Sequence, residues 1–232
     1  STDDVESTDD VESTEIATFD APCGRVVGTV DGPVIRARAI PYARADRFAA
    51  PEPVAPWTVP HRSDDPAAAC PQVSSPLVTM MLGGPATSLV ADEDCQRLTI
   101  TRPSRDFDAP LPVMVWVHGG AYILGSASQP LYHGRALATG GDVVVVTVNY
   151  RLGALGFLEL SSLGADSERF ATNVGLRDVA ALAELIIVAK AAGEDVVAVP
   201  AAQHLVAGGA VEAIVAGVAV KPVVAGIAVE DV

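Results

Sequence analysis

Two runs of almost uninterrupted apolar residues mark the middle of the chain. Val113–Val117 reads VMVWV and Val143–Val148 reads VVVVTV. Runs of this length, rich in β-branched residues, are typical of strands buried on both faces, as in a parallel sheet. Between them, Leu131–Thr139 is expected to form a helix that ends at Gly140-Gly141. The pattern therefore predicts a strand–helix–strand unit with parallel strands.

Shorter β-rich runs precede this unit. Arg25–Val30 and Val34–Ala39 flank Asp31-Gly32-Pro33, a turn sequence that predicts a hairpin, and Leu98–Thr101 is a further predicted strand. A second helix is expected after Asn173, where apolar residues recur at helical spacing: Leu176, Val179, Ala180 and Leu182. The fold class is therefore α/β, with an N-terminal antiparallel hairpin and mostly parallel central strands.

Both ends of the chain are repetitive, and they divide it into three parts: 1–14, 15–185 and 186–232. Residues 1–14 repeat the acidic hexapeptide STDDVE and are expected to be a disordered arm. This arm has no apolar core segment and is not predicted to be a signal peptide, which leaves the localisation unknown and cytoplasmic only by default. Residues 186–232 repeat every nine residues, with valine in one column and alanine in the next.

The nine-residue period restricts what the tail can form. An odd period moves equivalent residues to opposite faces in a helix or in a strand, so a regular structure needs a turn in each copy. Each copy offers glycine or proline for that turn. A small β-solenoid and a poorly ordered, aggregation-prone tail both remain open as interpretations. The repeat is also what a tandem duplication in the DNA would produce.

Charge and composition exclude several classes of function. The net charge is −14, which disfavours nucleic-acid binding and attraction to anionic membranes. The most apolar stretch, 205–229, is interrupted by Glu212, Lys221 and Pro222, so no membrane span is expected. The three cysteines form no Cys-x-x-Cys pair, and no His/Cys/Asp cluster has metal-ligand spacing. The sequence therefore predicts neither a metal site nor a cofactor.

Six motifs, taken together in chain order, resemble the type-B carboxylesterase and cholinesterase family. The first is Gly24–Trp57, in which Ala39 stands where the family usually has glycine. The others are Cys70-Pro71-Gln72, Glu93–Leu98 (EDCQRL), Pro112–Gly120 (PVMVWVHGG), Asn149–Phe157 (NYRLGALGF) and Asn173–Asp178 (NVGLRD). The resemblance covers about the first third of a full-length member. It implies a partial α/β-hydrolase fold and a small ester as the substrate class.

The resemblance assigns an oxyanion hole to the segment after the first buried strand. In this fold a loop of this type supplies backbone N–H groups to the negatively charged oxygen of the tetrahedral intermediate. The N–H groups of Gly120 and Ala121 would be the donors, and Gly119 would shape the turn. Without the family resemblance, the same residues are interpreted only as a Gly-Gly turn after a strand. His118 is expected to have a structural role.

Two further pairs follow from the resemblance. Cys70 and Cys95 occupy positions where many members form a disulfide, with two reduced buried thiols as the alternative. Glu93 and Arg151 resemble an ion pair that orients loops, with two exposed charges as the alternative. Cys23 receives no role.

The catalytic serine of the family is missing from these residues. Its nucleophile elbow has the sequence Gly-x-Ser-x-Gly, and none of the serines here has glycine two residues before and two residues after it. No triad acid or histidine can be assigned either. The expectation is a carboxylic-ester hydrolase by descent that is inactive as this chain. The alternatives are a non-catalytic interaction protein, with self-association through a sheet edge or the tail, and a defective gene product.

Overall fold

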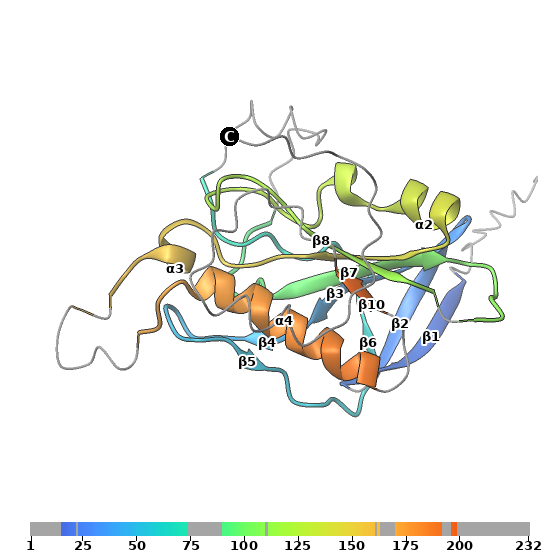
Figure 1. The fold of residues 1–232 in the computed structure, drawn as a ribbon, viewed down its shortest axis with the longest axis horizontal. Helices are drawn as coiled ribbons and strands as arrows, with labels where there is room; N and C mark the ends of the chain where they lie inside the picture. The colour runs from blue at the N-terminus through green and yellow to red at the C-terminus, as the bar shows by residue number, and fades with distance from the viewer. Residues whose placement is uncertain are drawn as a thin grey trace, which may run out of the picture.

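The computed structural model describes residues 15–21, 23–73, 90–109, 111–160, 162, 170–191 and 196–198. The expectations for residues 1–14 and for most of the repeat tail lie outside these residues. Within them the chain forms one eight-stranded sheet in the order β1-β2-β3-β7-β9-β8-β10, with β6 paired to β2 (Figure 1). A separate two-stranded sheet joins β4 and β5.

The strands are β1 (Ile16–Ala21), β2 (Gly24–Asp31), β3 (Val34–Pro41), β4 (Ala43–Arg44), β5 (Glu52–Pro53), β6 (His61–Arg62), β7 (Arg97–Pro103), β8 (Val113–Val117), β9 (Val144–Val148) and β10 (Val196–Ala198). The helices are η1 (Pro130–Tyr132), α2 (Arg135–Gly141), α3 (Gly153–Phe157) and α4 (Val174–Ala191).

The predicted hairpin and the two central strands are confirmed. β2 and β3 pair antiparallel with Asp31 opposite Val34, and β8 and β9 pair parallel with Val113 opposite Val144. The sheet is less parallel than predicted, however. Every neighbouring pair from β1 through β2, β3 and β7 to β9 is antiparallel, and only β9, β8 and β10 run parallel along this path. The alternating runs before residue 104 belong to this antiparallel half, which typically has one face less buried than the other.

The helix predicted over 131–139 begins later and ends later. Gly134 has φ +68°, a left-handed conformation that interrupts the helix, so η1 and α2 are separate elements. The helix expected after Asn173 is confirmed as α4 and runs to Ala191, past the predicted boundary between residues 185 and 186.

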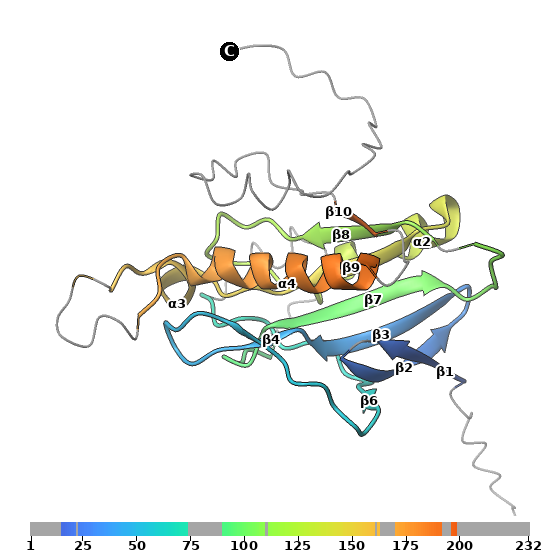
Figure 2. The ribbon, with the colours of Figure 1, turned by 60° about the horizontal axis from the view of Figure 1, so that its bottom comes forward.

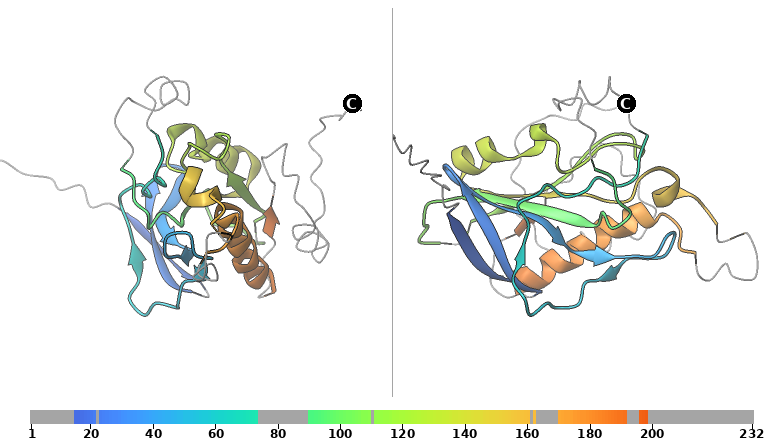
Figure 3. Two further views of the ribbon diagram at one scale, coloured as in Figure 1. Left: turned by 90° about the vertical axis from the view of Figure 1, so that its left-hand side faces the viewer. Right: turned by 180° about the vertical axis from the view of Figure 1, so that it is seen from behind.

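The two faces of the sheet are covered by different helices. Figures 1 and 3 show α2 and α4 on opposite sides. Ala138 of α2 packs with Val34 and Val145, whereas Leu182 of α4 packs with the neighbouring strand positions, among them Val146 and Val148. Adjacent residues of one strand point to opposite faces, so these contacts assign each face to its helix.

β10 was not predicted as a strand. It comes from the second copy of the nine-residue repeat and pairs parallel with β8, Val196 opposite Val113 and Ala198 opposite Val115 (Figure 2). Part of the repeat thus adds a strand to the sheet next to β8. The chain continues from β8 into the loop at Gly119–Ala121 (the Gly-Gly loop).

Candidate functional site

The loop that follows β8 has an unusual backbone. Gly120 has φ +130°, Ala121 has φ +53° and Tyr122 has φ +62°. The carbonyl oxygen of Gly120 accepts hydrogen bonds from the N–H groups of Ile123 at 3.1 Å and Leu124 at 3.2 Å. Non-glycine residues with positive φ are uncommon and cluster at functional sites, where neighbouring structure holds them. The sharp turn therefore marks this loop as the candidate site.

The N–H groups of the two expected donors, Gly120 and Ala121, and that of Gly119 have no acceptor within the described part of the chain. Gly119 and Ala121 are exposed and Gly120 is half-buried. Three consecutive amides without an internal acceptor are a concentration of positive dipole ends, which is suited to a negatively charged oxygen.

Gly119 and Gly120 differ in whether a side chain would fit at their positions. A Cβ built on Gly120 would lie 1.9 Å from the carbonyl oxygen of Leu124, inside the turn, whereas a Cβ on Gly119 would meet nothing within 4 Å. Only glycine can hold the conformation at position 120, because both the space and the positive φ exclude a side chain. Gly120 is thus required for the turn and Gly119 is not, which corrects the expectation that Gly119 shapes it.

His118 lies at the base of the loop and is almost fully buried. Its ring stacks on Tyr150 with 4.7 Å between centroids, and its Nδ1 lies 2.9 Å from the carbonyl oxygen of Gly119. The Tyr150 hydroxyl donates to the carbonyl oxygen of His118 at 3.0 Å. Burial lowers the pKa of His118 and raises the pKa of Tyr150 to about 12, so both are neutral at pH 7. In the described chain no imidazole is hydrogen-bonded to a serine hydroxyl, and the contacts of His118 support a structural role.

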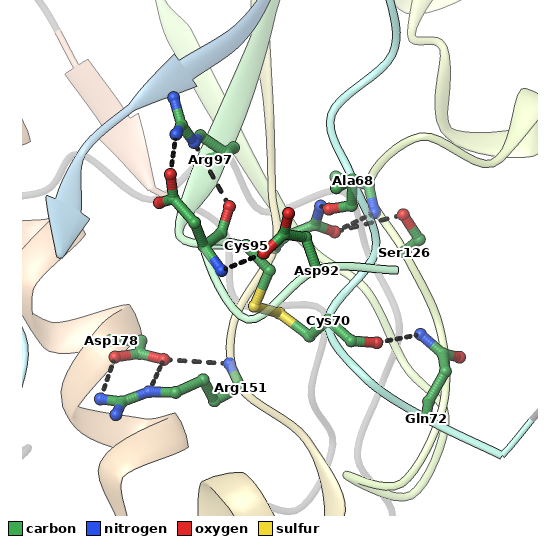
Figure 4. Close-up of a disulfide and its surroundings, with 12 residues drawn as sticks. Ala68, Cys70, Gln72, Asp92, Cys95, Arg97, Ser126, Arg151 and Asp178 are labelled. Atoms are coloured by element: carbon green, nitrogen blue, oxygen red, sulfur yellow. Dashed lines mark hydrogen bonds and ion pairs between the residues drawn. A yellow bond between two sulfur atoms is a disulfide. The ribbon is translucent and has the colours of Figure 1, made fainter. Parts of the chain in front are cut away.

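Gln72 fastens the far end of the loop. Its side-chain oxygen accepts a hydrogen bond from the Gly125 N–H at 2.7 Å, and its Nε2 donates to the carbonyl oxygens of Gly125 at 2.7 Å and Cys70 at 3.0 Å. Cys70 is joined to Cys95 by a disulfide, as the resemblance implies (Figure 4). Both cysteines are buried. The disulfide and the Gln72 amide together tie the loop to the segment before β7.

Asn149 is a second anchor at the end of β9. It is fully buried, and its side-chain oxygen accepts from the Ala127 N–H at 2.7 Å while its Nδ2 donates to the carbonyl oxygen of Ala68 at 2.8 Å. The Tyr42 hydroxyl donates to its main-chain oxygen at 2.7 Å. Buried amides that are fully hydrogen-bonded hold one arrangement of the segments they connect. Asn149 therefore holds together three segments that are distant in sequence.

The expected ion pair of Glu93 with Arg151 is wrong. Arg151 forms a buried bidentate pair with Asp178 of α4, at 2.9 Å from Nε to Oδ2 and 2.7 Å from Nη2 to Oδ1 (Figure 4). Glu93 instead pairs with Arg47 at the surface, and this guanidinium lowers the pKa of Glu93. Asp178 can reach Arg151 because α4 begins against that loop: a Cβ on Gly175 would lie 2.4 Å from the Arg151 carbonyl oxygen.

Gln72, Asn149 and Asp178 are the site residues that sequence reasoning missed. Each lies inside a motif that carried the family resemblance, but a motif alone does not show what its side chains contact. A buried polar side chain needs partners, and only the fold shows that those partners lie on the Gly-Gly loop, on the Ala68 segment and on Arg151.

The described residues offer no metal site and no membrane span. They contain no group of three or more His, Cys, Asp or Glu side chains that could hold a metal ion. The helices within them are all too short or too polar to cross a membrane.

Comparison with curated proteins places the chain among esterases. The family model described as "Carboxylesterase family" matches residues 15–186. The para-nitrobenzyl esterase of Bacillus subtilis (strain 168) is 43% identical over 165 residues, which covers 68% of this chain and 32% of that protein. Human carboxylesterase 3 is 42% identical over 149 residues, 61% of this chain and 25% of that protein. The chain thus spans about a third or less of the length of these relatives.

Solved structures agree with the sequences. A structure titled PNB esterase matches 79% of this chain and 38% of its own, with a TM-score of 0.68 and 38% identity. An esterase of Clostridium hathewayi, titled as able to hydrolyse aliphatic aromatic polyesters, matches 81% of this chain and 39% of its own, with a TM-score of 0.68 and 33% identity. Fold, motifs and family match lead to one assignment: the chain belongs to the carboxylesterase family.

Proposed function

We propose that this chain carries the oxyanion-binding loop of a carboxylic-ester hydrolase without the nucleophile that such an enzyme needs. The observation that supports the loop is the set of N–H groups at Gly119, Gly120 and Ala121 with no acceptor in the described residues. In acyl transfer these donors would stabilise the negative charge that develops on the carbonyl oxygen of an ester. Removing one such donor typically costs a hundred- to a thousand-fold in rate, about 3–4 kcal/mol.

The absence of catalytic residues from these 232 residues limits what the chain can do with an ester. A serine esterase needs a serine activated by a histidine that an acid orients. These 232 residues contain no Gly-x-Ser-x-Gly, and the imidazole nearest the loop, that of His118, is buried with its Nε2 unpartnered in the described part of the chain. We therefore expect the 232-residue chain to bind a negatively charged oxygen at the loop and not to hydrolyse esters.

A titration of backbone amides tests the loop. In a ¹H–¹⁵N spectrum, methylphosphonate, a tetrahedral anion, should shift the amides of Gly120 and Ala121 saturably. Binding in the millimolar range would correspond to about 4 kcal/mol. The variant Gly120→Pro lacks one donor and cannot hold the turn, so it should lose the shift at Ala121, while Gly119→Ala should keep it. Equal shifts in both variants would contradict a role for the loop in anion binding.

Self-association through the sheet edge is a second part of the proposal. β10 pairs with β8 over three residues, Val113 to Val115, and within the described residues Trp116 and Val117 have no strand partner on that edge. Unpaired edge positions are sites where a second chain can add a strand. We expect the apparent mass in light scattering to rise with concentration. A constant monomeric mass over a hundred-fold dilution series would rule this out.

A further inference from the structure

A cavity of about 280 Å³ lies between α2 and the face of the sheet that α2 covers. Trp116 of β8 and Val145 of β9 form its floor, and η1, Gly134 and the first turn of α2 form its walls. Neither Gly119 nor Gly120 lines it. Its volume lies just below the range of about 300–1,000 Å³ that is typical of pockets for drug-sized ligands, so only a small molecule fits it.

The walls of this cavity combine an apolar rim with polar groups. Leu131 and Leu137 line it and are 65% and 47% exposed, so apolar surface faces solvent at its mouth. Tyr132, His133 and Arg135 also line it. No Asp or Glu lines it among the described residues. Such walls match a ligand with an apolar body and an accepting, negatively charged end.

The charges around the cavity are positive, in contrast to the chain as a whole. Arg36 and Arg38 lie on the face of β3 that carries Val34, which packs against Ala138 of α2. The imidazole of His133 feels the charges of Arg36, Arg38 and Arg135, which together with burial, the largest cause, lower its pKa. Against these three cations stands one carboxylate, Asp31, which pairs with Arg135 at 2.5 Å.

Two of the three guanidinium groups have no carboxylate of their own. In the described part of the chain Arg36 and Arg38 form no ion pair, and Arg38 donates only to the backbone oxygen of Asp64 at 3.2 Å. The Asp64 carboxylate is engaged by Thr29 and Arg62. The Nε of Arg36 is buried and has no acceptor among the residues that the structure describes. Neither Arg36 nor Arg38 lines the cavity, so their positive charges act on its interior from a distance.

A buried donor without an acceptor in the described part of the chain, on Trp116, lines the cavity itself. The indole nitrogen of Trp116 is buried without an acceptor among the described residues, and its ring lies 5.5 Å from that of Tyr132. The two rings, tilted by 39° to each other, provide apolar surface in the same cavity that His133 and Arg135 line. Apolar contact and positive charge therefore lie within one small cavity.

We propose that the cavity between η1, α2 and Trp116 binds a small organic carboxylate, with its carboxylate at His133 and Arg135 and its apolar chain against Trp116, Tyr132 and Leu131. The guanidinium groups of Arg36 and Arg38 supply a positive field behind the carboxylate without contacting it. The site is separate from Gly119–Ala121, and it does not depend on the proposed function of that loop.

Calorimetry with sodium hexanoate tests this site, with hexanamide as the uncharged analogue and acetate as the analogue without an apolar chain. Hexanoate should bind saturably and at least ten-fold more tightly than either. The same titration followed by the NMR signal of His133 should show its pKa rising when hexanoate is bound, because a neighbouring anion favours the imidazolium. Absence of binding, equal affinity of hexanamide, or equal affinity of inorganic phosphate would overturn the proposal.

Three exposed or half-exposed positions give matched variants. Arg135→Gln should weaken hexanoate binding at least five-fold. Asp31→Asn should strengthen it, because it removes the one facing carboxylate and releases Arg135 from its pair. Arg105→Gln is the control, since Arg105 forms a similar exposed pair with Asp142 at 2.5 Å and does not line the cavity. An equal loss in Arg105→Gln, or unchanged affinity in Asp31→Asn, would contradict the site.

Discussion

Two buried polar groups on opposite faces of the sheet differ in their hydrogen bonding. On the α4 face, Arg151 and Asp178 are almost fully buried, and their charged groups pair with each other, while Arg151 also donates to the backbone oxygens of Asp46 and Ala49. On the α2 face, the Nε of Arg36 and the indole nitrogen of Trp116 are buried without acceptors in the described chain.

This difference indicates a structural role for one face and a binding role for the other. A buried charge pair that is fully hydrogen-bonded fixes one arrangement, and α4 and the loop after β9 depend on it. Unsatisfied donors give no such stability, and the α2 face also contains the cavity lined by Trp116, His133 and Arg135. The α4 face is therefore the structural one, and the α2 face is the one that we expect to bind.

The same substitution on the two faces should have opposite consequences. Arg151→Met leaves the carboxylate of Asp178 buried and unpaired, and should lower the free energy of unfolding by about 3–5 kcal/mol. Arg36→Met removes a half-buried guanidinium that has no ion-pair partner, and whose Nε has no acceptor, among the described residues, and should be neutral or stabilising without ligand. Urea unfolding followed by circular dichroism measures both. Equal destabilisation by the two variants would remove the distinction between the faces.

The disulfide is expected to be the next largest contribution. Cys70 and Cys95 are separated by 25 positions, and closing a loop of that size contributes about 3 kcal/mol in the chain-entropy description. Replacing both cysteines by alanine should lower the free energy of unfolding by this amount. Cys23→Ala is the control, since Cys23 is a free cysteine. An equal effect of Cys23→Ala would show that the loss is not due to the cross-link.

The Gly-Gly loop provides a sharper pair of variants. Gly120→Ala places a Cβ against the Leu124 carbonyl oxygen at a residue with positive φ, and should cost about 1–3 kcal/mol. Gly119→Ala meets no atom within 4 Å and should change the free energy of unfolding by under about 0.5 kcal/mol. Chemical denaturation of both variants measures the difference. A larger loss in Gly119→Ala would contradict the turn geometry.

The smallest expected effect is a pH dependence from His118. Burial lowers the pKa of His118 in the folded chain, so the unfolded chain, with the ordinary value of about 6.5, takes up the proton first. Stability should therefore fall as the pH drops below about 6.5. The variant His118→Phe keeps an aromatic ring against Tyr150 and should show a shallower fall between pH 7.5 and 5.5. An unchanged slope would show that His118 does not titrate in this way.

The sequence predicted the parts of the fold that depend on local pattern. The apolar runs gave β8 and β9 closely, and the Asp-Gly-Pro turn gave the β2–β3 hairpin. It did not predict β10, because a repeat with an odd period does not define a buried face. It also placed the start of α2 too early, since Gly134 is compatible with a helix until its φ of +68° is known.

The family resemblance pointed to the loop at Gly119–Ala121, whose role as an oxyanion hole stays a prediction, but it did not show which side chains support that loop. The residues alone gave only a Gly-Gly turn after a strand. The partner of Arg151 was assigned to Glu93 on family resemblance, whereas three-dimensional proximity decides ion pairs: Asp178 lies on α4 and Arg47 lies beside Glu93. Gln72 gave no signal of its own, since only the fold brings it to Gly125.

Hydrolysis of a chromogenic short-chain ester by the purified 232-residue chain tests the central claim most directly, namely that the oxyanion-binding loop is present and the nucleophile is not. We predict a rate equal to that of buffer, unchanged in Gly120→Pro and unaffected by a serine-directed organophosphate. Turnover that the organophosphate abolishes, and that Gly120→Pro also loses, would show a working serine centre and contradict the account.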